Sequence, residues 1–196
     1  MKTKIIILTS LLYIASVRHA AAQATSASDL VTIGHTMPAF TIVSDDGTQI
    51  PSARFGGKVI LINFFATWCP PCQTELAEME KTLWPEYRDR DDFALLVIGR
   101  EHSDAELKPY RDKKGFSFPL YPDRDRHIFA SFATQDIPRS YLIDRNGKII
   151  FATKGYTKRE FDNLIKAIDR ALLQGTSKNS EFKACEELKA EFTCRK

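Results

Sequence analysis

Apolar runs alternate with mixed polar stretches along the middle of the chain, and this pattern predicts strands that alternate with helices. Residues 59–66 (VILINFFA) and 93–99 (FALLVIG) are rich in β-branched and aromatic side chains. Such runs are typical of buried strands. Residues 73–81, between them, favour a helix by propensity. We expect this helix to reach about residue 90, with Pro85 kinking or dividing it, because proline has no N–H and crowds the preceding turn.

Two turn signals predict β-hairpins. The first is Ser44-Asp45-Asp46-Gly47 and the second is Arg145-Asn146-Gly147. Asp-Gly and Asn-Gly between short apolar segments are strong hairpin signals, because both favour the tight turns that join antiparallel strands. The apolar segments that flank the two turns are residues 40–43, 48–50, 140–144 and 148–152.

Cap signals and helical periodicity predict further helices. Ser103 and Glu106 form a capping box, so a helix begins there. A short extended piece at residues 118–121 and a short helix at residues 124–132 are expected next. A last helix, closed by Gly175, carries apolar residues at helical spacing. These residues are Phe161, Leu164, Ile165, Ile168 and Leu172.

The order of these elements predicts the architecture. Strands that alternate with helices pair in parallel through right-handed crossovers, and the second hairpin adds antiparallel strands to the same sheet. We therefore predict an α/β fold with a mixed central sheet, helices on both of its faces and an N-terminal β-hairpin. Residues 25–33, before that hairpin, are expected to be a weakly structured start.

The first 24 residues have the pattern of a secretory signal peptide. A basic start at residues 1–4 precedes an apolar segment, Ile5 to Val17, and then small residues that allow cleavage after Ala22 or Ala24. The alternative is a retained membrane anchor, but a spanning helix needs about 20 apolar residues and this run is shorter. We expect a domain at residues 25–174 and a short, helical C-terminal extension at residues 175–196.

Removing the leader changes the charge balance. The whole chain has 28 basic and 25 acidic residues, and the leader holds Lys2, Lys4 and Arg18 but no acid. The mature chain of about 172 residues therefore has 25 of each. A net charge near zero gives nucleic-acid binding no electrostatic support. The predicted protein is one soluble domain, periplasmic or otherwise exported, in a compartment where cysteines can form disulfides.

The pentapeptide Trp68-Cys69-Pro70-Pro71-Cys72 joins the first buried strand to the following helix. A helix N-terminus offers free N–H groups and partial positive charge, which favour a thiolate. Such settings lower a thiol pKa from about 8.5 to about 3.5–7.5. We expect Cys69, with an exposed sulfur, to be the nucleophile and Cys72, more buried, to be the resolving thiol. The alternative, half of a zinc site, lacks two further ligands at suitable spacing, so no metal and no cofactor are expected.

With this motif and a late Ile137-Pro138 before a hairpin, the chain resembles the thioredoxin superfamily, and more narrowly the TlpA/ResA-like exported thiol–disulfide oxidoreductases of the AhpC/TSA–redoxin group. The resemblance covers about residues 34–174 and rests on three stretches. These are the N-terminal hairpin, residues 63–75 and residues 137–148. It implies a thioredoxin-like fold.

The resemblance also implies roles for particular residues. Pro138 would be a cis-proline that faces the disulfide and presents the backbone of Ile137 to an extended substrate, where the alternative is an ordinary trans proline. Glu75 would tune the thiol pKa values or carry a proton for Cys72. The alternative for Glu75 is a solvated carboxylate on the helix surface. Trp68 is expected to flank the disulfide as an apolar wall or to be a simple core aromatic.

Three further side chains carry weaker signals. His102 follows the second strand and could lie near Cys69 if the two strands are parallel, although a solvated loop histidine is the commoner case. In the extension, Cys185 and Cys194 would be about 13.5 Å apart along one helix, whereas a disulfide needs Cα atoms within about 7 Å. An internal structural disulfide therefore requires the chain to turn back. Free thiols, a bridge between two chains or a relay to the active site stay open.

The predicted function is the reduction of disulfides in exported proteins, with a membrane thiol–electron donor to regenerate the dithiol. By resemblance, the lack of a long helical insertion before Pro138 argues against a DsbA-like oxidant. Two alternatives are a thiol peroxidase of the peroxiredoxin type, which would use a lone peroxidatic cysteine, and a redox-inactive binding module. The pair Cys69 and Cys72 weighs against both.

Overall fold

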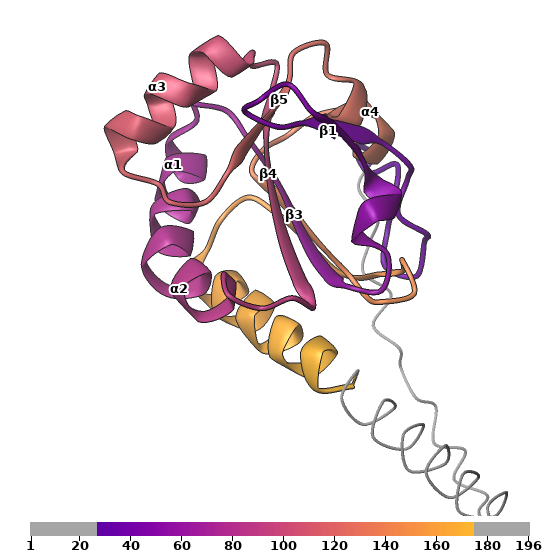
Figure 1. Ribbon diagram of the computed structural model, residues 1–196. Helices are drawn as coiled ribbons and strands as arrows, with labels where there is room; N and C mark the ends of the chain where they lie inside the picture. Colours follow the sequence, from indigo (N-terminus) through magenta and orange to yellow (C-terminus); the bar gives the residue numbers. More distant parts are fainter. Residues whose placement is uncertain (1–26, 175–196) are drawn as a thin grey trace, which may run out of the picture.

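The computed structural model describes residues 27–174, and a mixed five-stranded sheet forms their centre (Figure 1). The strand order is β5-β4-β3-β6-β7, in which β3 pairs in parallel with β4 and antiparallel with β6. The strands are β3 (Val59–Phe65), β4 (Phe93–Arg100), β5 (Leu120–Asp123), β6 (Arg139–Ile143) and β7 (Ile149–Lys154). The predicted mixed sheet, with the second hairpin joined to it, is confirmed.

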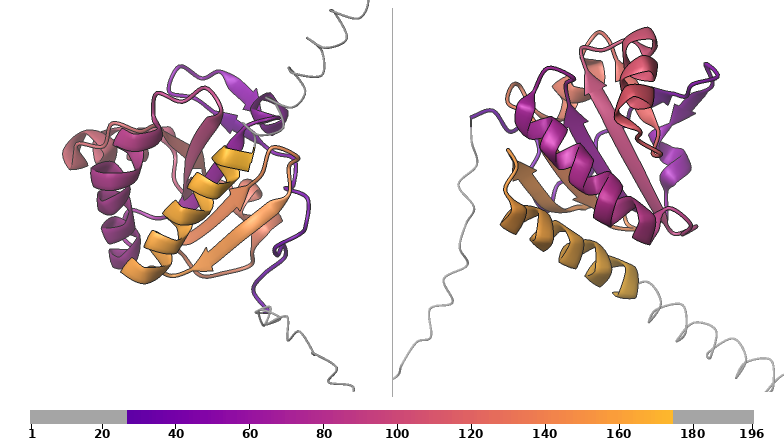
Figure 2. Two further views of the ribbon diagram at one scale, coloured as in Figure 1. Left: turned by 90° about the horizontal axis from the view of Figure 1, so that it is seen from below. Right: turned by 90° about the vertical axis from the view of Figure 1, so that its left-hand side faces the viewer.

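Helices cover both faces of this sheet, and two views at right angles show the layers (Figure 2). One face packs against α1, η2, α2 and the C-terminal helix, and the other packs against α4 and the N-terminal hairpin. The segments are α1 (Pro70–Glu78), η2 (Met79–Leu83), α2 (Trp84–Tyr87), α3 (Asp104–Lys114), α4 (His127–Phe132) and a helix at residues 158–174. The hairpin strands are β1 (Thr41–Val43) and β2 (Gln49–Pro51), and the 3-10 turn η1 (Ser52–Phe55) follows them.

Every residue of β3 is buried, which explains why its sequence is a continuous apolar run. Its alternate side chains enter two separate cores. Leu61 and Phe65 belong to the core beneath α1, and Ile62 and Phe64 belong to the core beneath α4. Each large apolar side chain buried in this way stabilises the fold by about 1.5–3 kcal/mol. Asn63 is the only polar residue of β3, and its side chain lies on the α1 side of the sheet.

The helix predicted from residue 73 to about 90 is divided, as Pro85 suggested. A π-helical segment, η2, separates α1 from α2. Pro85 lies in the first turn of α2, where a helix does not need the missing N–H. The capping box of Ser103 and Glu106 is also confirmed, and α3 begins directly after Ser103.

The expectation of a weakly structured start at residues 25–33 is wrong for its described part. Ser28 and Val31 are buried. The N–H groups of Leu30 and Val31 both donate to the carbonyl of Phe132, and Thr134 N–H donates to the carbonyl of Ser28. The segment is ordered by pairing with a distant part of the chain, which its local sequence does not reveal.

The predicted signal peptide and the extension with Cys185 and Cys194 lie outside the described residues. Their boundaries, and the Cys185–Cys194 disulfide, therefore stay predictions. Within residues 27–174, no helix has the length and apolarity that a membrane span requires.

Candidate active site

Cys69 and Cys72 form a disulfide at the N-terminus of α1, with their Cα atoms 5.3 Å apart. Cys69 is the N-cap residue, and its sulfur accepts the backbone N–H of Cys72 at 3.3 Å. Pro70 and Pro71 occupy the first helical positions, where proline is tolerated. The motif therefore places the Cys69 sulfur at the start of a helix, against the free backbone N–H group of Cys72.

The expected exposure of Cys69 is wrong for this oxidised form, because the residue is only 4% exposed and Cys72 is fully buried. The segment before β6 covers the disulfide. The carbonyl oxygen of Ile137 lies 3.9 Å from Cys69 Sγ. A reaction partner must therefore reach the sulfur beside this backbone.

The Ile137–Pro138 peptide bond is cis, as the resemblance implied. Pro138 is buried and Ile137 is half-buried. The Pro138 carbonyl accepts the N–H of Gly155, which joins the cis-proline turn to the end of β7. This arrangement holds the Ile137 backbone beside the disulfide.

Glu75 is almost fully buried, so the alternative of a solvated helix-surface carboxylate is wrong. Its two oxygens accept hydrogen bonds from Asn63 Nδ2 and Ser140 Oγ, each at 3.0 Å. Asn63 Nδ2 also donates to Ser140 Oγ at 2.9 Å. Three polar side chains from β3, α1 and β6 thus form one closed network inside the core, one helical turn from Cys72.

Burial raises the pKa of Glu75 from 4.5 to about 7, and the hydrogen bonds from Ser140 and Asn63 oppose the shift. A carboxyl group with this pKa can accept or release a proton near neutral pH. Asn63 and Ser140 were not among the residues predicted for the site. The signal that could have found Asn63 is its position as a lone amide in an apolar strand.

Trp68 is 62% exposed, so the alternative of a core aromatic is wrong. The Arg100 guanidinium lies 5.7 Å from the centre of the Trp68 ring and 5.2 Å from that of Phe129. Arg100 therefore lies between an exposed and a buried aromatic ring. A large apolar surface next to Cys69 is thereby held in place at the protein surface.

His102 is buried rather than solvated, and it contacts the loop that leads to Cys69. Its Nε2 accepts the N–H of Thr67 at 3.0 Å, so Nε2 is the unprotonated ring nitrogen. At the carbonyl group of the same residue, Gln73 Nε2 donates a hydrogen bond to Thr67 O at 2.7 Å. Desolvation lowers the pKa of His102, which favours the neutral ring that this contact needs. Two side chains thus fix the turn between β3 and α1.

Within residues 27–174, no group of three or more His, Cys, Asp or Glu side chains is placed to hold a metal ion. The geometry that the described residues do present is a dithiol–disulfide pair at a helix N-terminus, a backbone segment beside it and a buried carboxyl group beneath it. This arrangement suits the exchange of disulfides with another molecule.

Comparison with known proteins agrees with this chemistry. The model of the AhpC/TSA family matches residues 33–152. The thiol–disulfide oxidoreductase ResA of Bacillus cereus is 29% identical over 144 residues, which are 73% of this chain and 82% of that protein. ResA of Bacillus thuringiensis subsp. konkukian is 30% identical over 137 residues, which are 69% of this chain and 78% of that protein. A solution structure from Bacteroides thetaiotaomicron has a TM-score of 0.73 at 35% identity and covers 79% of this chain and 99% of that one.

Proposed function

Because the chain belongs to the AhpC/TSA family and is a thiol–disulfide oxidoreductase, we propose that it is an exported reductant of protein disulfides that acts through Cys69 and Cys72. The observation that carries the proposal is the Cys69–Cys72 disulfide at the start of α1, beside the backbone of Ile137. An enzyme that works on proteins needs both a reactive sulfur and a surface that aligns a polypeptide next to it.

The reaction proceeds in two exchanges. The Cys69 thiolate attacks one sulfur of a substrate disulfide, forms a mixed disulfide and releases the first substrate thiolate. The Cys72 thiolate then attacks Cys69 Sγ, which forms the Cys69–Cys72 disulfide and releases the second substrate thiolate. Two electrons pass from the enzyme dithiol to the substrate, and the two protons that the enzyme thiols lose balance those that the substrate thiolates gain.

Glu75 is proposed to take the proton of the Cys72 thiol before the second exchange. Cys72 has no exposure to solvent, so its proton needs an acceptor inside the protein. Glu75 lies one turn along the same helix, and its pKa of about 7 suits this task near neutral pH. Asn63 and Ser140 hold its carboxyl group in one orientation.

Trp68, Ile137 and Pro138 are proposed to bind the substrate. The cis turn presents the Ile137 backbone, which can pair with an extended segment of the substrate, as an added strand pairs with a sheet edge. Trp68, which precedes Cys69 in the chain, supplies an exposed apolar surface. Substrate recognition would thus rest on backbone pairing and apolar contact, which suits many different protein disulfides.

Export and electron supply complete the proposal. The first 24 residues resemble a signal peptide, and an exported dithiol must be kept reduced by a membrane thiol–electron donor. The segment between β4 and Pro138 contains α3, β5 and α4. It carries no long helical insertion of the DsbA type, which supports reduction as the direction.

Insulin reduction with a thiol donor tests the activity. Wild type should precipitate the insulin B chain, whereas Cys69→Ala should not. Cys72→Ala should accumulate mixed disulfides at Cys69 in the exported fraction, and mass spectrometry would identify the attached proteins. A wild type that consumes peroxide with the same donor but leaves insulin intact would contradict the proposal.

A further inference from the structure

Arg139 directly follows the cis-proline, and its side chain is buried at the junction of three segments. The residue is 2% exposed. Its Nε donates to the carbonyls of Gln135 and Asp136, at 3.0 and 3.1 Å. Its Nη2 donates to Ser28 Oγ at 2.6 Å, and its Nη1 makes an ion pair and a hydrogen bond with Asp29.

These contacts join the N-terminal segment to the loop that leads to the active site. Residues 28–31 already pair through their backbone with residues 132–134. The Arg139 guanidinium adds hydrogen bonds from β6 to the N-terminal segment and to the loop before Ile137. A planar group with five donors in a fixed fork can hold several acceptors at once in one geometry, which an ammonium group cannot.

The loop at residues 135–137, directly before Pro138, needs such support. Asp136 has a φ of 68°, in the left-handed region that a residue with a side chain adopts at a cost. Its carbonyl accepts from Arg139, and its carboxylate accepts from the Ser28 hydroxyl at 3.3 Å. Ile137, whose carbonyl lies beside Cys69 Sγ, is the next residue. The position of the Ile137 backbone is therefore set by the contacts of Arg139 and Ser28.

We propose that Arg139, together with Ser28 and Asp29, is a positioning residue that holds the Ile137 backbone in register with Cys69 for pairing with a polypeptide substrate. The inference rests on the proposed function, because it concerns the surface on which a protein disulfide would be aligned. It also gives Ser28 and Asp29 a part in the reaction, although they lie far from the cysteines in sequence.

The test compares two disulfide probes with the reduced full chain in single-turnover experiments. The first is an extended peptide that carries a mixed disulfide with a fluorescent thiol. The second is 5,5′-dithiobis(2-nitrobenzoate), which has no polypeptide backbone to pair. The ratio of the two rates reports alignment of the backbone, whereas a general loss of folding or of thiol reactivity lowers both rates together.

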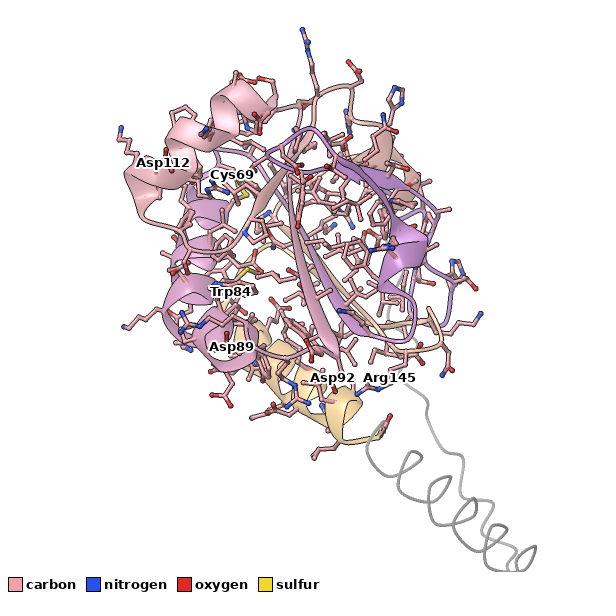
Figure 3. All side chains as sticks on the ribbon, in the orientation of Figure 1. Cys69, Trp84, Asp89, Asp92, Asp112 and Arg145 are labelled. Atoms are coloured by element: carbon pink, nitrogen blue, oxygen red, sulfur yellow. A yellow bond between two sulfur atoms is a disulfide. The ribbon has the colours of Figure 1, made fainter. Side chains whose placement is uncertain are left out.

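Arg145→Met is the matched control for Arg139→Met. Arg145 is also in the β6–β7 hairpin and also binds a carboxylate, Asp92, at 2.8 Å. It lies beside Asp92 at the end of the domain away from Cys69 (Figure 3). Losing either arginine removes a guanidinium and an ion pair, but only Arg139 contacts the loop before Ile137.

We expect Arg139→Met to lower the ratio of peptide to small-probe rate about tenfold or more, since a displacement of about 1 Å by a remote mutation can cost about a hundredfold in rate. Arg139→Lys keeps the charge near Asp29 but loses the fork, so its ratio should fall less. Arg145→Met should keep the wild-type ratio. If Arg139→Met does not fold, Asp29→Asn decides by the same ratio.

An unchanged ratio in the folded Arg139 or Asp29 variants, or an equal fall in Arg145→Met, would overturn the inference. The proposed function fails in a different way. In that case wild type itself would leave the peptide disulfide intact while reacting with the small probe, and no variant would be needed to show it.

Discussion

The replacement of Glu75 by glutamine should make the oxidised protein more stable at neutral and alkaline pH, and nearly the same at acidic pH. Glutamine resembles the protonated carboxyl group in size and can still bond Asn63 and Ser140. It differs in that it cannot ionise. The variant therefore removes one contribution, the cost of holding a negative charge inside the core beneath the disulfide.

The sign and size of the effect follow from the pKa of Glu75, which burial raises from 4.5 to about 7. Between these values the folded state holds a proton that the unfolded state has released, so wild-type stability falls as pH rises. Above pH 7 both states are ionised and the loss is complete. At about 1.4 kcal/mol for each pKa unit, the two values correspond to about 3 kcal/mol.

Urea unfolding of both proteins with the disulfide intact, over a series from about pH 4 to pH 8, measures this difference. The free energy of unfolding of Glu75→Gln minus that of wild type should rise from near zero to about 3 kcal/mol. The subtraction cancels the other titrating groups. Glu78→Gln, a partly exposed position on the same helix, controls for the loss of a carboxylate from α1. A separation between Glu75→Gln and wild type that stays constant across the series would refute the reasoning.

Three further predictions concern the surroundings of the disulfide. Trp68→Ala should slow reaction with the peptide disulfide while changing the urea midpoint little, because the side chain is 62% exposed. Because the pKa of His102 is lowered in the folded state, the unfolded state takes up a proton before the folded state does as pH falls below 6.5. Wild type should therefore lose more stability on acidification than His102→Gln. Urea unfolding of both proteins at two pH values measures this difference. In Gly99→Ala the new Cβ would lie 2.8 Å from a buried methyl of Leu107, and thermal unfolding should show a loss of about 1–3 kcal/mol.

The sequence predicted the elements whose signals are local. The apolar runs, the hairpin turns and the capping box of Ser103 depend on neighbouring residues, and all appear in the structure. Cys69, Cys72 and Pro138 could be singled out because each stands in a short motif. The burial of Glu75 could not, since a carboxylate in a helix is solvated unless a distant strand covers it. Its partner Ser140 lies 65 residues away along the chain.

The role of Arg139 was not predicted for the same reason, because its partners are distant in sequence. A local rule could still have predicted which face of the sheet its side chain occupies. Successive side chains of a strand point to opposite faces of a sheet. Ser140 and Leu142 therefore enter the core beneath α1, with Glu75, while Arg139 and Tyr141 enter the core beneath α4. The buried strand carries one polar residue toward each core, and each meets a polar partner there. With Pro138 placed at the disulfide, this alternation alone predicts that the Ser140 side chain faces α1 and that the Arg139 side chain lies on the opposite face of the sheet. The acceptor on that face is Asp29, which belongs to a segment more than a hundred residues earlier in the chain. Only the tertiary structure shows that this segment lies there.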